Sequence, residues 1–168
     1  NKLGGFAGIA PGFSVNYNAT LFEEAGLALP PTNWNDSSWN WNTMLTYAKR
    51  LTRVNSEGAA TQYGVDFWDA DNLIGYAWAF GGDWFSPDSY TSGIVGMPTL
   101  NTPANVRGYE QVAALRTDLG VRPGGRIPAA TPISGVGSFQ NGLLGMWIDG
   151  VSVARPDAQP QVKAYKWG

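Results

Sequence analysis

The spacing of hydrophobic positions predicts four helices separated by short strands. One face of a helix is marked by apolar side chains at helical intervals, namely Trp41, Met44, Leu45, Ala48 and Leu51. With shorter segments of the same kind, the pattern predicts helices near 19–25, 41–53, 72–81 and 103–119. Alternating or continuous apolar runs predict strands near 13–17, 62–68, 143–148 and 162–167.

Residue types at the expected helix ends support these boundaries. Polar side chains suited to N-cap positions are Asn18, Asn40, Asp71 and Thr102, and glycines follow the expected ends at Gly26, Gly81 and Gly120. The buried face of the last long helix is predicted to hold Val106, Tyr109, Val112, Ala113, Leu115 and Leu119. The stretches 84–101 and 121–137 are rich in Gly, Pro and small polar residues and predict loops, and 138–142 predicts a helical turn.

The alternation of strands and helices indicates an α/β fold with a mixed or parallel sheet flanked by helices, forming one domain over 1–168. In such sheets, ligands bind outside the carboxyl ends of the strands. The strand ends to consider are therefore Asn16-Tyr17, Phe67-Trp68-Asp69 and Ile148-Asp149-Gly150.

The composition of the chain excludes several classes of binding partner. Hydrophobic residues make up 43% of the 168 residues, charged residues only 14%, and the net charge is −2, which argues against disorder and against a nucleic-acid partner. The longest basic cluster, Lys49, Arg50 and Arg53, falls at a helix end, where it suits the helix dipole. No apolar run approaches the roughly 20 residues of a membrane span, so we expect no membrane insertion by this segment.

The absence of two residue types excludes much catalytic chemistry. The chain has no Cys, which excludes disulfides, thiolate nucleophiles and Cys-ligated metals. It has no His, which excludes a Ser-His-Asp triad, a His base and His-ligated metals. We therefore expect no catalytic metal, no cofactor and no covalent intermediate.

Carboxylates would have to carry any acid–base chemistry. Asp66, Asp69 and Asp71 lie within six residues, and Asp83 follows. Such a group could serve a glycosidase or bind Ca²⁺, but the spacing matches no specific pattern, and Asp71 is better explained as a helix cap. The glycine runs 4–8 and 135–137 lack the context of phosphate-binding loops and are expected to be turns.

The aromatic residues are the feature of the composition that points to ligand binding. The chain has 8 Trp, 7 Tyr and 7 Phe, several beside small polar residues, as is typical of rings that stack on sugars. Tyr17 and Trp68 end expected strands and are read as ligand contacts rather than core. Trp41 is expected in the core, and for Trp78 core and ligand contact are about equally favoured.

The chain contains several short motifs in a fixed order: Val15-Asn16-Tyr17-Asn18 through Gly26-Leu27, Pro30-Pro31-Thr32, the helix from Ser38 to Thr52, Tyr63-Gly64-Val65, Ala79-Phe80-Gly81-Gly82-Asp83, Asn101-Thr102-Pro103, and Phe139 to Gly142 continuing to Gly145-Met146 and Gly150. Together these motifs resemble the extracellular solute-binding proteins of bacterial sugar ABC transporters. Residues 164–168 are similar to the strand that returns across the hinge. Two departures are Gly145, where Ala is usual, and Val151-Ser152, where many members have an aromatic residue.

The resemblance implies a maltose-binding-protein-like fold of two α/β lobes with a sugar clamped between them. The chain would cover most of the second lobe, without the first lobe and the C-terminal return segment. The absence of an initiator Met and of a signal peptide agrees with a processed product or a cut-out piece. Implied partners are a sugar and the permease subunits of an ABC importer, and the implied location is extracytoplasmic, with a lipid anchor on the missing N-terminus. The implied ligand-binding residues are Asn16, Tyr17, Trp68, Asp69, Trp78, Asp149, Gly150 and Ser152.

Two other functions remain open from the sequence. One is a carboxylate-based glycosidase or a free-standing carbohydrate-binding domain. The other is a structural domain whose aromatic residues all belong to the core.

Overall fold

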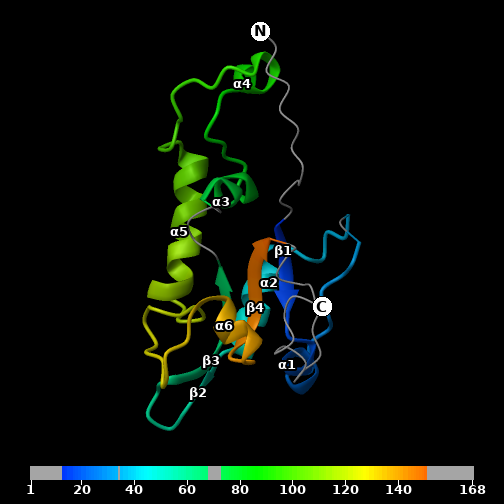
Figure 1. Cartoon of the computed structure of the whole chain (residues 1–168), viewed down its shortest axis with the longest axis vertical. Coiled ribbons are helices and arrows are strands. Elements are labelled where there is room, and N and C mark those ends of the chain that lie inside the picture. The colour runs from blue at the N-terminus through cyan, green and yellow to red at the C-terminus, as the bar shows by residue number, and fades with distance from the viewer. Residues whose placement is uncertain (1–12, 34, 68–72, 151–168) are drawn as a thin grey trace.

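The computed structural model describes residues 13–33, 35–67 and 73–150 (Figure 1). Its strands are β1 (Phe13–Tyr17), β2 (Arg53–Val54), β3 (Ala60–Phe67) and β4 (Leu144–Gly150). Its helices are α1 (Ala19–Glu24), α2 (Trp41–Leu51), α3 (Leu73–Ala79), α4 (Pro87–Ser92), α5 (Pro103–Thr117) and α6 (Gly135–Gln140). The predicted strand at 162–167 lies outside the described residues.

The four strands form one mixed sheet in the order β1-β4-β3-β2. The two middle strands, β3 and β4, are parallel, and Phe67 pairs with Ile148 near their carboxyl ends. Both flanking strands are antiparallel to their neighbours, and β1 pairs Phe13 with Gly150 and Tyr17 with Met146. The predicted α/β class with a mixed sheet is confirmed.

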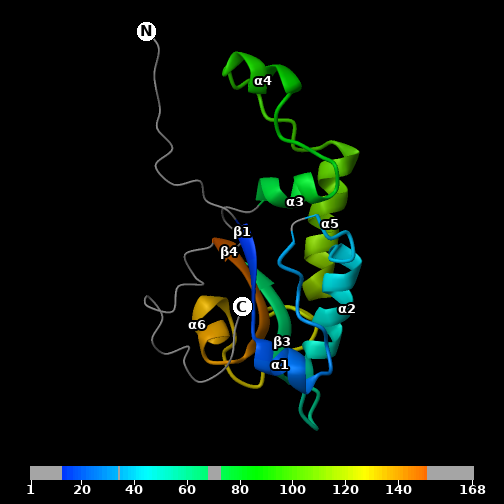
Figure 2. The same cartoon turned by 90° about the vertical axis from the view of Figure 1, so that its right-hand side faces the viewer.

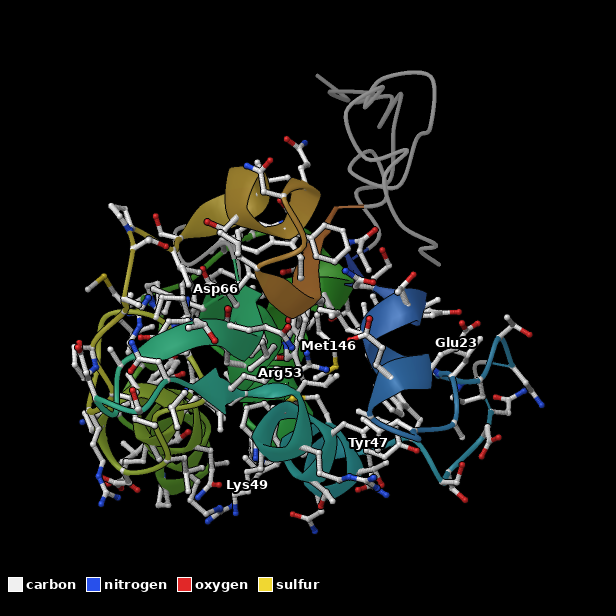
Figure 3. The ribbon with its side chains drawn as sticks, turned by 90° about the horizontal axis from the view of Figure 1, so that it is seen from below. Glu23, Tyr47, Lys49, Arg53, Asp66 and Met146 are labelled. Carbon is white, nitrogen blue, oxygen red and sulfur yellow. The ribbon has the colours of Figure 1, made fainter. Side chains whose placement is uncertain are left out.

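Helices cover both faces of the sheet. In Figure 2, α6 lies on one side and α2 and α5 on the other. The larger hydrophobic cluster, on the α2 side, contains Phe22, Met44, Leu51, Val65, Leu115 and Met146, all buried. The smaller cluster, on the α6 side, contains Tyr63, Phe139, Leu144 and Trp147. Figure 3 shows Met146 in the interior and Lys49 of α2 at the periphery.

Three predicted helix caps are present with the expected hydrogen bonds. The Asn18 side chain accepts from the Leu21 N–H at 3.1 Å, and Asn40 accepts from the N–H groups of Asn42 and Thr43. Thr102 accepts from the Asn105 N–H at 3.2 Å. The predicted cap Asp71 lies outside the described residues. The predicted apolar face of α2 is confirmed, since Met44, Ala48 and Leu51 are buried, with Trp41 and Leu45 packed against the same cluster.

The buried face of α5 differs from the prediction. Val112 and Leu115 are buried as expected, but Val106 and Ala113 are exposed, and the stripe continues through Asn105 and Gly108. Gly108 is buried because α3 comes so close that an added Cβ would lie 2.5 Å from the Tyr76 carbonyl oxygen. Asn105 is buried because its amide donates to the carbonyls of Asp83 and Thr99. The periodicity of apolar residues does not predict the burial of Gly108 or of Asn105, because neither has an apolar side chain.

Two segments predicted as loops contain helices. Within 84–101, α4 has no buried residue and projects beyond the end of the sheet, far from β2 (Figure 1). At 135–137, the glycines predicted as turns begin α6, three residues before the predicted helical turn. Within the described ranges, no helix has the length and apolar character needed to cross a membrane.

Candidate functional site

The carboxyl ends of β3 and β4 lie side by side and define one edge of the sheet. Phe67 ends β3, Gly150 ends β4, and the two strands run in the same direction with Phe67 opposite Ile148. The first residue of β1, Phe13, faces Gly150. This edge, formed by the ends of β3 and β4, is the candidate ligand-binding edge, because ligands of α/β sheets bind outside such strand ends.

A buried ion pair fixes the end of β3 just below this edge. Arg122 donates from Nε to Oδ1 of Asp66 at 2.8 Å, and both side chains are buried. A second Arg122 nitrogen donates to the Phe67 carbonyl, and the guanidinium lies 4.7 Å from the centre of the Phe67 ring. Asp66 also accepts from the N–H of Gly135, where α6 begins. Asp66 therefore ties β3 to two distant loops, which argues against the catalytic or Ca²⁺-binding role weighed for it.

Asp149 holds a carboxylate close to the edge. It lies in β4, is partly exposed, and accepts a hydrogen bond from Nε1 of the buried Trp147 at 3.1 Å. The carboxylate is thus oriented by a core side chain. Gly150 follows it as the last residue of the strand.

The direction of β1 separates Asn16 and Tyr17 from the position we expected. Because β1 is antiparallel to β4, its carboxyl end points away from the candidate edge, and Tyr17 lies opposite Met146. That pair is two residues, or about 7 Å, from Ile148. Asn16 is buried, and its side-chain amide donates to the Trp147 carbonyl at 3.1 Å. In the structure Asn16 therefore holds two strands together, while its proposed contact with ligand stays a prediction.

Tyr17 instead lines a pocket beside β1 with a volume of about 500 Å³. The lining of this β1 pocket includes Ser14 and Val15 of β1, Ile148 of β4, and Asp36 and Trp39 of the following loop. Hydrogen bonds from the Ser38 side chain and backbone lower the pKa of Asp36 below its ordinary value, so the pocket carries a carboxylate that is ionised at neutral pH.

Trp78 is the most exposed of the described residues that we predicted to bind ligand. It lies on α3 with 52% of its surface exposed, so it does not belong to the core. Nearby, the carboxylate of Asp83 accepts from the Phe85 N–H at 3.0 Å and from the Tyr90 hydroxyl at 2.8 Å. The hydrogen bond from the Phe85 backbone is the main cause that lowers the pKa of Asp83, and the bond to Asp83 raises the pKa of Tyr90. This pair attaches α4 to the segment that follows α3.

Three predicted site residues, Trp68, Asp69 and Ser152, lie outside the described residues. Of the others, the structure brings Asp149 and Gly150 to the candidate edge and places Asn16 and Tyr17 farther along β1. Among the residues that the structure describes, no group of three or more carboxylates could hold a metal ion.

Sequence reasoning missed two contributors to this region. Arg122 lies in a Pro- and Gly-rich stretch that predicts an exposed loop, yet only 2% of its side chain is exposed. The one sequence feature that could have indicated its burial is the position of this single Arg between Val121 and Pro123, and that feature is weak evidence. The β1 pocket was missed because its walls come from segments that only the fold brings together.

Comparison with known proteins identifies relatives at the level of family and fold. A family-level sequence model described as bacterial extracellular solute-binding protein matches residues 6–168. A search of curated proteins found no match.

Several solved structures share the fold. An ABC substrate-binding protein from Listeria monocytogenes in complex with cycloalternan is 23% identical, with a TM-score of 0.66, and the match covers 92% of this chain and 35% of that one. The maltose/maltodextrin-binding domain MalE from Bdellovibrio bacteriovorus bound to maltotriose is 19% identical, with a TM-score of 0.65 and coverages of 93% and 35%. UgpB from Mycobacterium tuberculosis in complex with glycerophosphocholine is 17% identical, with a TM-score of 0.62 and coverages of 93% and 34%. This chain thus spans about a third of the length of these proteins.

Proposed function

Because the chain belongs to the family of bacterial extracellular solute-binding proteins, we propose that it forms one lobe of a two-lobe protein that binds a sugar or oligosaccharide. The bound sugar is then delivered to the permease subunits of an ABC importer. The observation that carries the proposal is the family match over nearly the whole chain, 6–168.

The ligands of the fold neighbours support a polyhydroxylated solute. Two of them were solved with cycloalternan and maltotriose, and a third with glycerophosphocholine. The chemistry of the lobe agrees with such a ligand, since exposed aromatic rings cover the apolar faces of a pyranose and carboxylates accept hydrogen bonds from its hydroxyls. Trp78 and Asp149 are the described residues that supply these two groups.

In this proposal the ligand lies at the candidate edge, between this lobe and a second one. We further propose that Trp68, Asp69, Gly150 and Ser152 contact it, as the family resemblance implies. The family is described as extracellular, and we place the protein outside the cytoplasm. A lipid anchor stays a prediction.

The test is a ligand screen on the complete two-lobe protein by calorimetry and intrinsic Trp fluorescence. The probes are maltotriose, cycloalternan, D-mannitol and glycerophosphocholine. Saturable binding of a carbohydrate probe is expected, with no new reducing ends after long incubation. Binding of glycerophosphocholine alone would contradict the substrate class, and release of reducing sugar would favour the glycosidase instead.

A further inference from the structure

The segment that follows α4 exposes a run of apolar side chains to solvent. Ile94, Val95 and Met97, which we call the apolar tip, have 75%, 63% and 93% of their surfaces exposed. α4 itself has no buried residue, so nothing in the described part of the chain covers this run. Apolar side chains that gather on the surface of a folded domain are typical of a surface that binds another protein surface.

Hydrogen bonds fasten the base of the segment that carries the apolar tip. The Thr99 N–H donates to the Trp84 carbonyl at 2.7 Å and closes residues 84–99 into a loop, which we call the arm. The buried side-chain amide of Asn105, in the first turn of α5, donates to the carbonyls of Asp83 and Thr99 at 2.8 and 2.6 Å. The arm is therefore attached to α5 by a buried polar group, and its tip projects from a fixed base.

The arm lies at the same end of the sheet as the candidate edge. β3 and β4 are parallel, and in Figures 1 and 2 α4 lies beyond the carboxyl ends of both strands. β2 lies toward the opposite end of the sheet (Figure 1). Under the proposed function the second lobe faces the candidate edge, so the arm extends toward the space that this lobe would occupy.

We propose that the apolar tip packs against an apolar surface of the second lobe of the same protein, an inference that rests on the proposed two-lobe function. This chain covers 35% of two of its fold neighbours, so most of a protein of that length is available to form the opposing surface. The arm has one charged residue, Asp88, and no Lys or Arg, which argues against an anionic membrane surface or a nucleic acid as the partner.

Thiol labelling of the complete two-lobe protein tests the contact, because this part of the sequence has no Cys of its own. In the lobe, Met97 is 93% exposed and Val54 of β2, far from the arm, is 51% exposed, so Met97→Cys should react with a maleimide at least as fast as Val54→Cys if the tip is bare. We expect the reverse, with Met97→Cys slower on the order of tenfold, as for a contact that is present about 90% of the time. Mass spectrometry of the peptide that contains each position gives the two rates.

A charge beside the thiol tests whether the contact is apolar. Ile94→Glu added to Met97→Cys should restore fast labelling, because a carboxylate is costly to bury against apolar groups. A neighbouring carboxylate by itself makes a thiol less reactive, so faster labelling reports lost cover. Val54→Glu is the matched control and should leave the labelling of Met97→Cys slow.

Carbohydrate binding, measured by calorimetry on the same samples, separates this inference from the proposed function. If Met97→Cys reacts as fast as Val54→Cys while carbohydrate still binds, the inference is overturned and the proposed function stands. Slow labelling in a protein that binds no carbohydrate would support the contact and contradict the proposed function alone. Slow labelling that becomes fast on dilution would assign the tip to a second copy and would overturn the inference as well.

Discussion

Two tryptophan side chains of this chain have opposite surroundings. Trp147 lies in β4 with 1% of its surface exposed and packs in the cluster beneath α6, whereas Trp78 is 52% exposed on α3. The two rings therefore contribute differently to folding, because an aromatic ring stabilises the folded chain mainly through the apolar area that it buries.

We expect Trp147→Ala to lower the free energy of unfolding by about 3–5 kcal/mol, since it leaves a large cavity and removes the donor to Asp149. Trp78→Ala should change it by less than about 1 kcal/mol. Urea unfolding of both variants, followed by circular dichroism, measures the difference. In the two-lobe protein, Trp78→Ala should instead weaken sugar binding, and a large stability loss in this variant would remove Trp78 from the proposed site.

Removing only one partner of the Asp66–Arg122 ion pair should strongly lower the free energy of unfolding. Arg122→Met leaves a buried carboxylate without its cation and should destabilise the chain by about 3–5 kcal/mol. The double variant Arg122→Met with Asp66→Leu removes both charges and should recover part of that loss. Denaturant unfolding of the single and double variants gives the comparison. A double variant less stable than Arg122→Met would show that the ion pair is not the source of the effect.

The packing of α2 against β3 depends on the absence of a side chain at Gly64. An added Cβ would lie 1.9 Å from the Ala48 carbonyl oxygen, which belongs to the α2 backbone and cannot rotate away. Gly64→Ala should therefore cost about 3 kcal/mol or more of unfolding free energy.

Gly75→Ala is the matched control, because it adds the same methyl group in α3 with no atom within 4 Å. This substitution should stabilise the chain by about 0.5–1 kcal/mol through helix propensity. Thermal unfolding of the two variants distinguishes close packing from an intrinsic effect of alanine. Equal shifts of the two midpoints would contradict the close approach of α2 and β3.

Acid should loosen the attachment of α4 to the segment that follows α3. The folded-state pKa of Asp83 lies below its ordinary value of 3.8, so the stabilisation from Asp83 is complete above 3.8 and is lost as pH falls through the folded pKa. We expect amide exchange in α4 to accelerate over that range while exchange in β3 stays slow. In Asp83→Asn, the acid transition should disappear and the raised pKa of Tyr90 should fall toward its ordinary value. An unchanged Tyr90 titration in this variant would contradict the pairing.

The helices and strands that the sequence predicted well are those whose buried positions hold apolar side chains at regular spacing. The predicted helix over 41–53 matches α2, because Met and Leu recur on its buried face at helical spacing. The predicted strand over 13–17 matches β1, because its apolar and polar residues alternate. Helix α4 was missed because it buries nothing, so no periodicity marks it. The reversed direction of β1 was missed because direction depends on which strand it joins, and that partner lies about 130 residues later. That direction places Tyr17 opposite Met146 and away from the candidate edge, while its ligand contact stays a prediction.

At the scale of the whole molecule, the proposed function makes this chain one of two lobes and gives it one wall of the ligand site. Binding pockets for small molecules enclose most of the ligand surface, whereas in this proposal the candidate edge would contact a single face of the ligand. The 168-residue chain alone should therefore bind the probe that saturates the two-lobe protein at least about 100-fold more weakly, by calorimetry, because closure cannot add contacts. Equal affinities would show that the lobe contains the complete site.

The pairing of β1 with β4 also determines when this chain can fold. β1 is synthesised well before its partner β4, which spans Leu144–Gly150, so the sheet cannot close until residue 150 has left the ribosome. At about 5–20 residues per second, the first strand waits roughly 7 to 27 seconds for its neighbour. Contacts so distant along the chain also make the folding step itself slow. During that interval, the backbone groups of β1 that pair with β4 in the folded chain have no partner, and an unpaired strand of this kind is open to pairing with other chains.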